Sequence, residues 1–374
     1  MTSQRLANTG QYESFRDHAG RSIINLSGGF GLQVPQIISN VYDQTELMGL
    51  SNRVLLSEPL IRLCRTVANL LPVSLSTSYV CSSGDEAFEG ALKLCKGLHP
   101  GRRSIAYLTG GDYGCLSYGR IMNNPAGNAE MMRFLGIHLK PISSAADLQN
   151  LDLSDCFAFC HPYVHHDSAG HFALAPSPLL REAYALTSRH NVPTIGYDVD
   201  TCLGPLGTMF GFQKAGVVPD VLVIGGALNG GAVPIGMYVC SESTAYKVYG
   251  RSTPAKHGST TAGNPMSCIA ALAALEHARA IDAPTLCEQN GFALTAALSR
   301  LSARTVGGFV AIPLESSTDR AFLMNRLYKA GVFVSHPQGS DLVLQPPVCS
   351  RRDALLEGAA RILEVMTHEV THAA

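Results

Sequence analysis

Short hydrophobic runs alternate with segments of helical period along most of the chain, and this alternation restricts the fold more than any other feature. The runs, rich in β-branched and aromatic residues, are Ser104–Leu108, Phe157–Cys160, Thr194–Asp198 and Val221–Ile224. Between them, segments such as Leu179–His190 repeat their apolar residues with the period of an amphipathic helix. Strands and helices that alternate in this way form a mostly parallel sheet covered by helices. We therefore predict an α/β protein.

The pattern changes beyond a helix predicted over Met266–Ile281, where Asn264 supplies the cap and Pro265 the first helical position. Short strands and helices then follow one another in an α+β pattern that ends in a helix beginning at Arg352. We expect three parts, which are an N-terminal segment joining the small domain (1–45), a large α/β domain (46–281) and a small C-terminal α+β domain (282–374).

Composition and charge exclude several classes of function. Charged residues make up 15% of the chain, against about a quarter in an average soluble domain, so weakly charged surface must be covered and we expect a homo-oligomer. A net charge of −1 with no basic tract argues against nucleic-acid binding.

The uncharged stretch Val221–Cys240 is interrupted by glycines and Pro234, which favours strand, loop and strand over a membrane span. The polar first twenty residues lack a secretory signal, which indicates a cytoplasmic protein. Eleven scattered cysteines without a Cys-x-x-Cys pair indicate neither a disulfide framework nor a thiolate zinc site.

A helix start follows the run that ends near Cys81. Ser83 and Glu86 have the spacing of a capping box, and free amides at such a helix start can bind an anion. Taken alone, the segment favours an ordinary capped helix over an anion site.

Six blocks of the chain resemble, in the same order, motifs of the class III (ω-type) aminotransferases, which are pyridoxal-phosphate enzymes of fold type I. The blocks are Ser82–Glu89, Gly110–Gly114, His161–Pro162, Tyr197–Gly207, Gly225–Gly231 and His257–Pro265. The resemblance implies a large domain with a mostly parallel sheet of the seven-stranded type flanked by helices, a small α+β domain, a homodimer and a small-molecule substrate.

Departures from the motifs occur where the family contacts its coenzyme. Gly226 stands where the family has the lysine that forms the Schiff base, so the chain offers no amine there. Tyr197 replaces the aspartate that pairs with the pyridine nitrogen, and Asp200 replaces a glutamine beside the ring oxygen. Asp112 replaces the stacking aromatic ring, and Asp85 replaces a threonine of the phosphate site, where its charge would repel a phosphate.

These departures lead to an expectation about the cofactor. The former coenzyme positions implied by the resemblance are Ser83, Gly84, Asp85, Asp112, Tyr113, Gly226 and Thr260. We interpret the replacements as the loss of Schiff-base chemistry: no cofactor is expected, and pyridoxal phosphate would bind only as a weak non-covalent ligand. The first alternative is a pyridoxal-phosphate-dependent class III aminotransferase that uses an unrecognised lysine, for which Lys256 is one candidate.

The leading hypothesis is then acid/base chemistry on a small molecule, as in a lyase, isomerase or cyclase of specialised biosynthesis. The candidate proton carriers are Asp198, Asp200, His161, His166 and Tyr197. Asp198 and Asp200 are two residues apart on a predicted strand, so they would share one face and separate each other's pKa, while Tyr197 would lie on the other face unless the strand ends there. A structural role for the two carboxylates, capping a helix or binding Arg120, is equally compatible with the sequence.

Two further alternatives remain. Four histidines fall within His161–His171, and His161, His166 and Asp200 could form a two-histidine, one-carboxylate site for a transition metal. Without a metal, a histidine there would act as a general acid or base. The other alternative is a non-catalytic partner that stabilises an active relative through the dimer surface.

Overall fold

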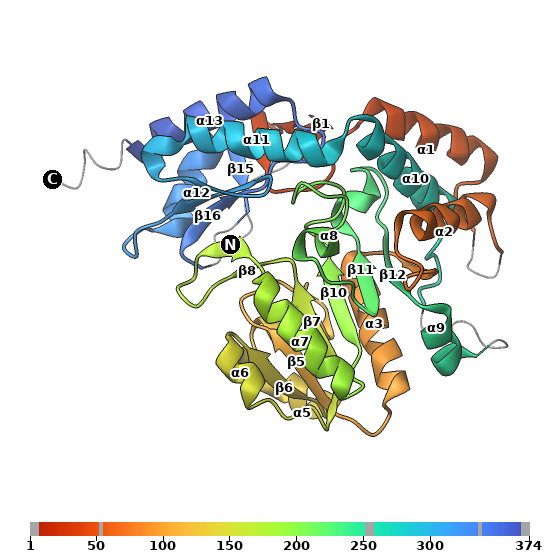
Figure 1. Cartoon of the computed structure of the whole chain (residues 1–374). Coiled ribbons are helices and arrows are strands. Elements are labelled where there is room, and N and C mark those ends of the chain that lie inside the picture. Colours follow the sequence, from red (N-terminus) through yellow and green to blue (C-terminus); the bar gives the residue numbers. More distant parts are fainter. Residues whose placement is uncertain (1–6, 52–54, 251–257, 336–338, 368–374) are drawn as a thin grey trace.

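The computed structural model describes residues 7–51, 55–250, 258–335 and 339–367 (Figure 1), and Lys256 lies outside these ranges. A seven-stranded sheet forms its centre, in the order β4-β12-β11-β10-β7-β5-β6. The strands are β4 (Thr77–Cys81), β5 (Ser104–Leu108), β6 (His138–Ile142), β7 (Cys156–Pro162), β10 (Thr194–Asp198), β11 (Val221–Ile224) and β12 (Gly236–Cys240). All neighbours from β11 to β6 pair in parallel, and β12 runs antiparallel to both of its neighbours. The predicted mostly parallel sheet is confirmed.

Helices cover both faces of this sheet. They are α1 (Pro35–Met48), α2 (Glu58–Leu70), α3 (Gly84–Leu98), α4 (Ser117–Asn123), α5 (Ala129–Leu135), α6 (Ala145–Gln149), α7 (Ser177–Arg189), α8 (Gly211–Ala215), α9 (Glu242–Tyr249) and α10 (Pro265–Ala280). Successive residues of β11 alternate between two buried clusters, with Leu222 and Ile224 in one and Val221 and Val223 in the other. A strand buried on both faces reads as a continuous apolar run, which explains the sequence pattern.

Local signals fix the two helices that matter most for the site. At the start of α3, the Ser83 hydroxyl accepts a hydrogen bond from the Glu86 amide (3.1 Å), and the Glu86 carboxylate accepts one from the Ser82 amide (2.6 Å). At the start of α10, the Asn264 side chain accepts a hydrogen bond from the Ser267 amide (2.9 Å). These bonds satisfy amides that have no partner within the helix, so both helices begin where the sequence predicts.

The C-terminal part carries two smaller sheets. One joins β1 (Ala7–Gln11), β2 (Ser14–Asp17), β3 (Ser22–Leu26) and β15 (Val332–Val334), and the other joins β13 (Arg304–Val306), β14 (Phe309–Pro313) and β16 (Asp341–Leu344). Helices α11 (Ala283–Ala297), α12 (Arg320–Lys329) and α13 (Arg352–Thr367) accompany them. β3 pairs in parallel with β15, so the N-terminal strands lie against the C-terminal elements, drawn in blue in Figure 1. The exact domain boundaries stay a prediction.

The uncharged stretch from residue 221 to 240 forms β11, a short 3-10 helix (Gly226–Asn229) and β12, as predicted. Within the described residues, no helix combines the length and the apolar character that crossing a membrane requires. The cytoplasmic location stays a prediction.

Candidate active site

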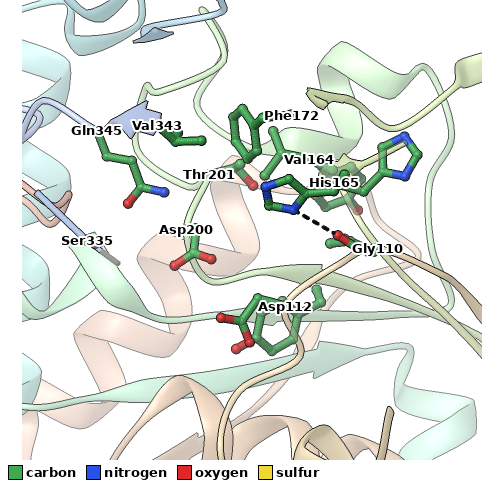
Figure 2. A pocket seen from close by; sticks show the side chains of 14 residues that line it. Gly110, Asp112, Val164, His165, Phe172, Asp200, Thr201, Ser335, Val343 and Gln345 are labelled. Carbon is green, nitrogen blue, oxygen red and sulfur yellow. Dashed lines mark hydrogen bonds between the residues drawn. The ribbon is translucent and has the colours of Figure 1, made fainter. Parts of the chain in front are cut away.

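A cavity opens where β5, β7 and β10 end, at the carboxyl edge of the central sheet. Ligands of α/β proteins collect at this edge because the loops there converge. One wall consists of residues that follow β5 and β7. In it, the Gly110 carbonyl, in the loop after β5, accepts a hydrogen bond from the His166 amide (2.8 Å). This bond joins the loop after β5 to β8 (Val164–His166). The opposite wall comes from Ser335, Val343 and Gln345 of the C-terminal part, as Figure 2 shows.

The two walls are joined by a buried carboxylate. Phe172 lies on β9 (Phe172–Leu174), which pairs with β8, and its amide donates to Asp341 Oδ2 on β16 (2.7 Å). Arg304 on β13 forms an ion pair with the same carboxylate and donates to the Phe172 carbonyl (2.6 Å). The small sheet is thereby fixed against the loop that contains the histidines.

Tyr197 lies at the floor of the cavity, at the end of β10. Its side chain is 4% exposed and packs against Phe88 and Tyr113. The phenol donates to Asp85 Oδ1 (3.3 Å), and Asp85 Oδ2 accepts from the Cys115 amide (2.9 Å). Burial, together with the nearby carboxylates, raises the pKa of Tyr197 well above its usual value, so the phenol stays protonated and acts as a hydrogen-bond donor.

Asp112 and Asp200 both line the cavity and point into it (Figure 2). The Asp112 carboxylate accepts hydrogen bonds from the Gly114 amide (2.9 Å) and from the Asn123 side chain (2.9 Å). Asp200 has no hydrogen-bond partner within the described part of the chain. Asp200 is exposed to the cavity. The surrounding protein, followed by the charges of Asp112 and Asp85, raises the pKa of Asp200 above its usual value.

Asp198 does not line the cavity, which contradicts the expectation that it shares a face with Asp200. β10 ends at Asp198 and the chain turns, so strand alternation does not extend to residue 200. The buried Asp198 carboxylate instead accepts from the Gly211 amide at the start of α8 (2.8 Å) and from the Thr201 hydroxyl. Burial raises its pKa to about 7. Its role is to hold the turn that places Asp200.

The two candidate histidines have different environments. His161 is fully buried in β7, where Nδ1 donates to the Pro162 carbonyl (3.1 Å) and Nε2 accepts from the Tyr184 hydroxyl (2.8 Å). Burial lowers its pKa to about 4, so it is a neutral core residue that does not line the cavity. His166 lines the cavity, its Nδ1 lies 3.4 Å from the Gly110 carbonyl, and burial lowers its pKa. Because His161 lies away from Asp200, the alternative metal site does not assemble: in the described ranges no three His, Cys, Asp or Glu side chains are placed to hold a metal ion.

The remaining positions implied by the resemblance are mostly structural. Ser83 caps α3, and Gly84 packs so closely against Val199 that a Cβ would overlap its side chain. Tyr113 is buried and donates to the Leu108 carbonyl (2.6 Å). Thr260 is exposed and is not part of the cavity wall.

Gly226 tests whether the described residues fit a covalently held coenzyme. Its φ is +49°, and a Cβ there would overlap the backbone oxygen of Val199. Of the seven lysines in the sequence, the six that lie in described ranges are all absent from the cavity wall. The described residues therefore do not supply the family's covalent anchor, and we derive no reaction step through the coenzyme.

The sequence did not indicate two parts of the cavity lining, which are Phe172 on β9 and the wall that the C-terminal part contributes. Phe172, Ser335, Val343 and Gln345 reach the cavity only through contacts between distant segments. No short sequence motif indicates that these four residues share one site.

Comparison with known proteins places the fold. The family model for class-III aminotransferases matches residues 167–366, which is more than half of the chain. An amine transaminase from an uncultivated Pseudomonas species, solved in its PLP-bound internal-aldimine form, superposes with a TM-score of 0.84 at 20% identity, covering 97% of this chain and 95% of the other. The ornithine aminotransferase of Toxoplasma gondii gives a TM-score of 0.86 at 20% identity, with coverages of 99% and 92%. An (S)-enantioselective ω-transaminase from Thermomicrobium roseum gives 0.82 at 21% identity, with coverages of 97% and 93%.

These matches correct the expectation drawn from the motif departures. The sequence led us to expect a cofactor-free lyase, isomerase or cyclase without transaminase activity, and that expectation is wrong: the matching family model is that of aminotransferases, and the similar solved structures include a PLP-bound transaminase. The chain belongs to the class-III aminotransferase family.

Proposed function

We propose that the chain is a class-III aminotransferase that moves an amino group between a small-molecule amine and a carbonyl compound, with pyridoxal phosphate as its coenzyme. The observation that carries the proposal is the position of the cavity in a chain of this family: it lies at the carboxyl edge of the sheet, beside the start of α3, and the C-terminal part closes it.

The cavity residues have distinct capacities for such chemistry. The Tyr197 phenol at the floor stays protonated and donates its hydrogen to Asp85, and Asp200 presents a carboxyl group whose pKa is raised. His166 is neutral at pH 7 because burial lowers its pKa. The lining therefore combines a phenol that is fixed by its bond to Asp85 with a carboxyl group that can accept or release a proton.

The anchoring amine must come from a lysine that the family motif does not identify. The experiment is to incubate purified protein with pyridoxal phosphate, record its absorbance from the near ultraviolet into the violet, and reduce it with borohydride. We expect a coenzyme band that borohydride abolishes, a labelled lysine found by peptide mass spectrometry, and amino transfer from a panel of amines. A protein that shows no band, no labelled lysine and no transfer would overturn the proposal.

We also infer that the chain forms a homodimer through α1, α2 and the described residues next to α2 that include Leu56. Large apolar side chains are exposed there, with Leu47 82%, Leu56 74% and Tyr42 64% accessible. Exposed apolar residues gathered on neighbouring elements mark an interaction surface. Light scattering after gel filtration should give twice the chain mass, and Leu47→Glu should reduce it to the monomer. Phe134→Glu on α5, a residue 89% exposed, is the matched control and should leave the dimer intact.

A further inference from the structure

The cavity lies between two groups of lining residues. One group, which includes Asp112 and Tyr197, belongs to the carboxyl edge of the central sheet. The other group combines the C-terminal wall with four residues of the β8–β9 hairpin (164–174), which are Val164, His165, His166 and Phe172. In the sequence, the hairpin belongs to the large domain, because it connects β7 to α7. Its contacts show to which side it is bound more firmly.

A buried charge fixes the hairpin to the C-terminal part. The fully buried Asp341 carboxylate on β16 accepts from the Phe172 amide (2.7 Å), and His171 Nδ1 lies 3.2 Å from the same carboxylate. Arg304 forms an ion pair with Asp341 and donates to the Phe172 carbonyl (2.6 Å). Hydrogen bonds with an ionised partner are roughly twice as strong as bonds between neutral groups. The hairpin therefore contributes partners to a carboxylate that would be costly to leave unpaired.

The turn of the hairpin makes a second set of bonds with the residue before β16. The Ser340 amide donates to the Gly170 carbonyl (2.6 Å), and the Ser340 hydroxyl donates to the Ala169 carbonyl (2.9 Å). The Phe172 ring packs edge-on against Phe309 of β14, with 5.9 Å between the ring centroids. Both the turn and the second strand of the hairpin are thus bound to the small sheet.

On its other side the hairpin contacts the loop after β5 through neutral groups. The His166 amide donates to the Gly110 carbonyl (2.8 Å), and His166 Nδ1 lies 3.4 Å from the same oxygen. His165 Nδ1 lies 3.3 Å from the Thr109 carbonyl. Both histidines are neutral at pH 7, because burial lowers the pKa of each. These contacts are weaker than the bonds to Asp341 and Arg304.

From this difference we propose that the β8–β9 hairpin is a lid carried by the C-terminal part, and that the cavity opens where the hairpin meets the loop after β5. Opening separates the His166 amide from the Gly110 carbonyl and leaves the bonds to Asp341 and Ser340 intact. The inference goes beyond the proposed function, since it concerns which parts of the chain move together.

Hydrogen exchange of the purified full chain tests the proposal without any ligand. Mass spectrometry with electron-transfer fragmentation resolves single amides, and the rates are corrected for the intrinsic rate of each amide. The amides of Phe172 and Ser340, which report the contact with the small sheet, should exchange at least about tenfold more slowly than the amide of His166. Equal protection of the three amides, or faster exchange at Phe172 or Ser340, would overturn the proposal.

Two variants show whether the buried carboxylate holds the lid. Asp341→Asn should accelerate exchange at Phe172 and Ser340 by about tenfold. Asp17→Asn is the matched control: Asp17 is also buried, pairs with Arg21 (2.7 Å) and accepts from two backbone amides, but it lies on β2 in the other small sheet. It should leave the exchange of the hairpin amides unchanged. Identical exchange of these amides in the two variants would count against the lid.

A reversible cross-link tests the movement itself. A Cβ built at Gly170 lies 3.5 Å from the Ser340 Cβ, which suits a disulfide. Gly170→Cys/Ser340→Cys should therefore cross-link on mild oxidation. Gly170 has φ +82°, so the double variant carries backbone strain, but the reduced and oxidised forms share it. Ser340→Cys alone, oxidised in the same way, is the control for effects on the native cysteines.

The cross-linked form should keep the kcat and KM of amino transfer within about twofold of the reduced form, because the lid and the small sheet move together. Turnover that stops on oxidation and returns with a reductant would overturn the proposal, and so would cysteines that fail to cross-link. Only this kinetic measurement rests on the proposed function. Failure of that function would appear as a missing coenzyme band and missing amino transfer in the parent protein, while hydrogen exchange would still decide the lid.

Discussion

Replacing Gly226 by alanine tests whether the backbone at this position excludes a side chain. Gly226 has φ +49°, and a Cβ would overlap the Val199 carbonyl oxygen, which is backbone and has no rotamer to change. Gly216 at the end of α8 is a matched control: its φ is +69°, and nothing lies within 4 Å of a Cβ built there. Both positions are left-handed, so the two variants share the conformational cost and differ in the overlap.

The expected magnitudes follow from that comparison. The left-handed conformation costs a residue with a Cβ about 1–2 kcal/mol, and both variants should lose this amount. Overlap with packed atoms adds about 1–3 kcal/mol, which only Gly226→Ala should lose. Because domains are stable by about 5–15 kcal/mol, the variant should still fold.

The assay is urea denaturation of both variants and the parent protein at one protein concentration, since the proposed dimer would make stability depend on concentration. Gly226→Ala should unfold at a clearly lower urea concentration than Gly216→Ala. Equal midpoints would refute the reasoning, because they would show that the backbone near Val199 adjusts to a side chain at little cost.

Three further predictions concern groups in and near the cavity. Tyr197→Phe removes the hydrogen bond to Asp85 and should lower the free energy of unfolding by about 1 kcal/mol; an unchanged urea midpoint would show that this bond contributes nothing. The pKa of Asp198 is raised from 3.8 to about 7, so the folded protein binds the extra proton and Asp198's stabilising contribution is lost as pH rises from about 4 through 7. Asp198→Asn should flatten the pH dependence of the melting temperature across that window, and a slope identical to the parent's would contradict the assignment. The pKa of His161 is lowered from 6.5 to about 4, so the unfolded chain binds the extra proton and the stability of the fold falls as pH drops through that interval. His161→Gln should therefore reduce the fall in melting temperature between pH 6.5 and about 4. A fall as large as that of the parent protein would contradict this prediction.

Most of the fold could be predicted from the sequence because its signals are local. β10 and β11 are bounded as the apolar runs indicate, and the caps at Ser83 and Asn264 begin the helices that the sequence predicts. These features depend on neighbours in the chain, so a single sequence records them.

The site was less predictable, because side-chain direction depends on where a strand ends. The alternation rule placed Asp198 and Asp200 together, but the turn after residue 198 directs Asp198 toward α8 and Asp200 into the cavity. His161 was proposed as a proton carrier from its place among four histidines, yet it lies within the sheet, bonded to Tyr184. The Val343 and Gln345 wall depends on the packing of the C-terminal part, which no short motif encodes.

Gly226 is part of a wider backbone arrangement. Gly84 at the start of α3, Gly225 after β11 and Gly236 at the start of β12 all approach neighbouring backbone or Val199 so closely that none has room for a Cβ. A side chain at position 226 would therefore require the Val199 carbonyl to move. Gly226→Lys would accordingly strain this junction. It follows that a lysine trapped by borohydride in this chain must reach the cavity from another segment, and its place in the sequence would identify that segment.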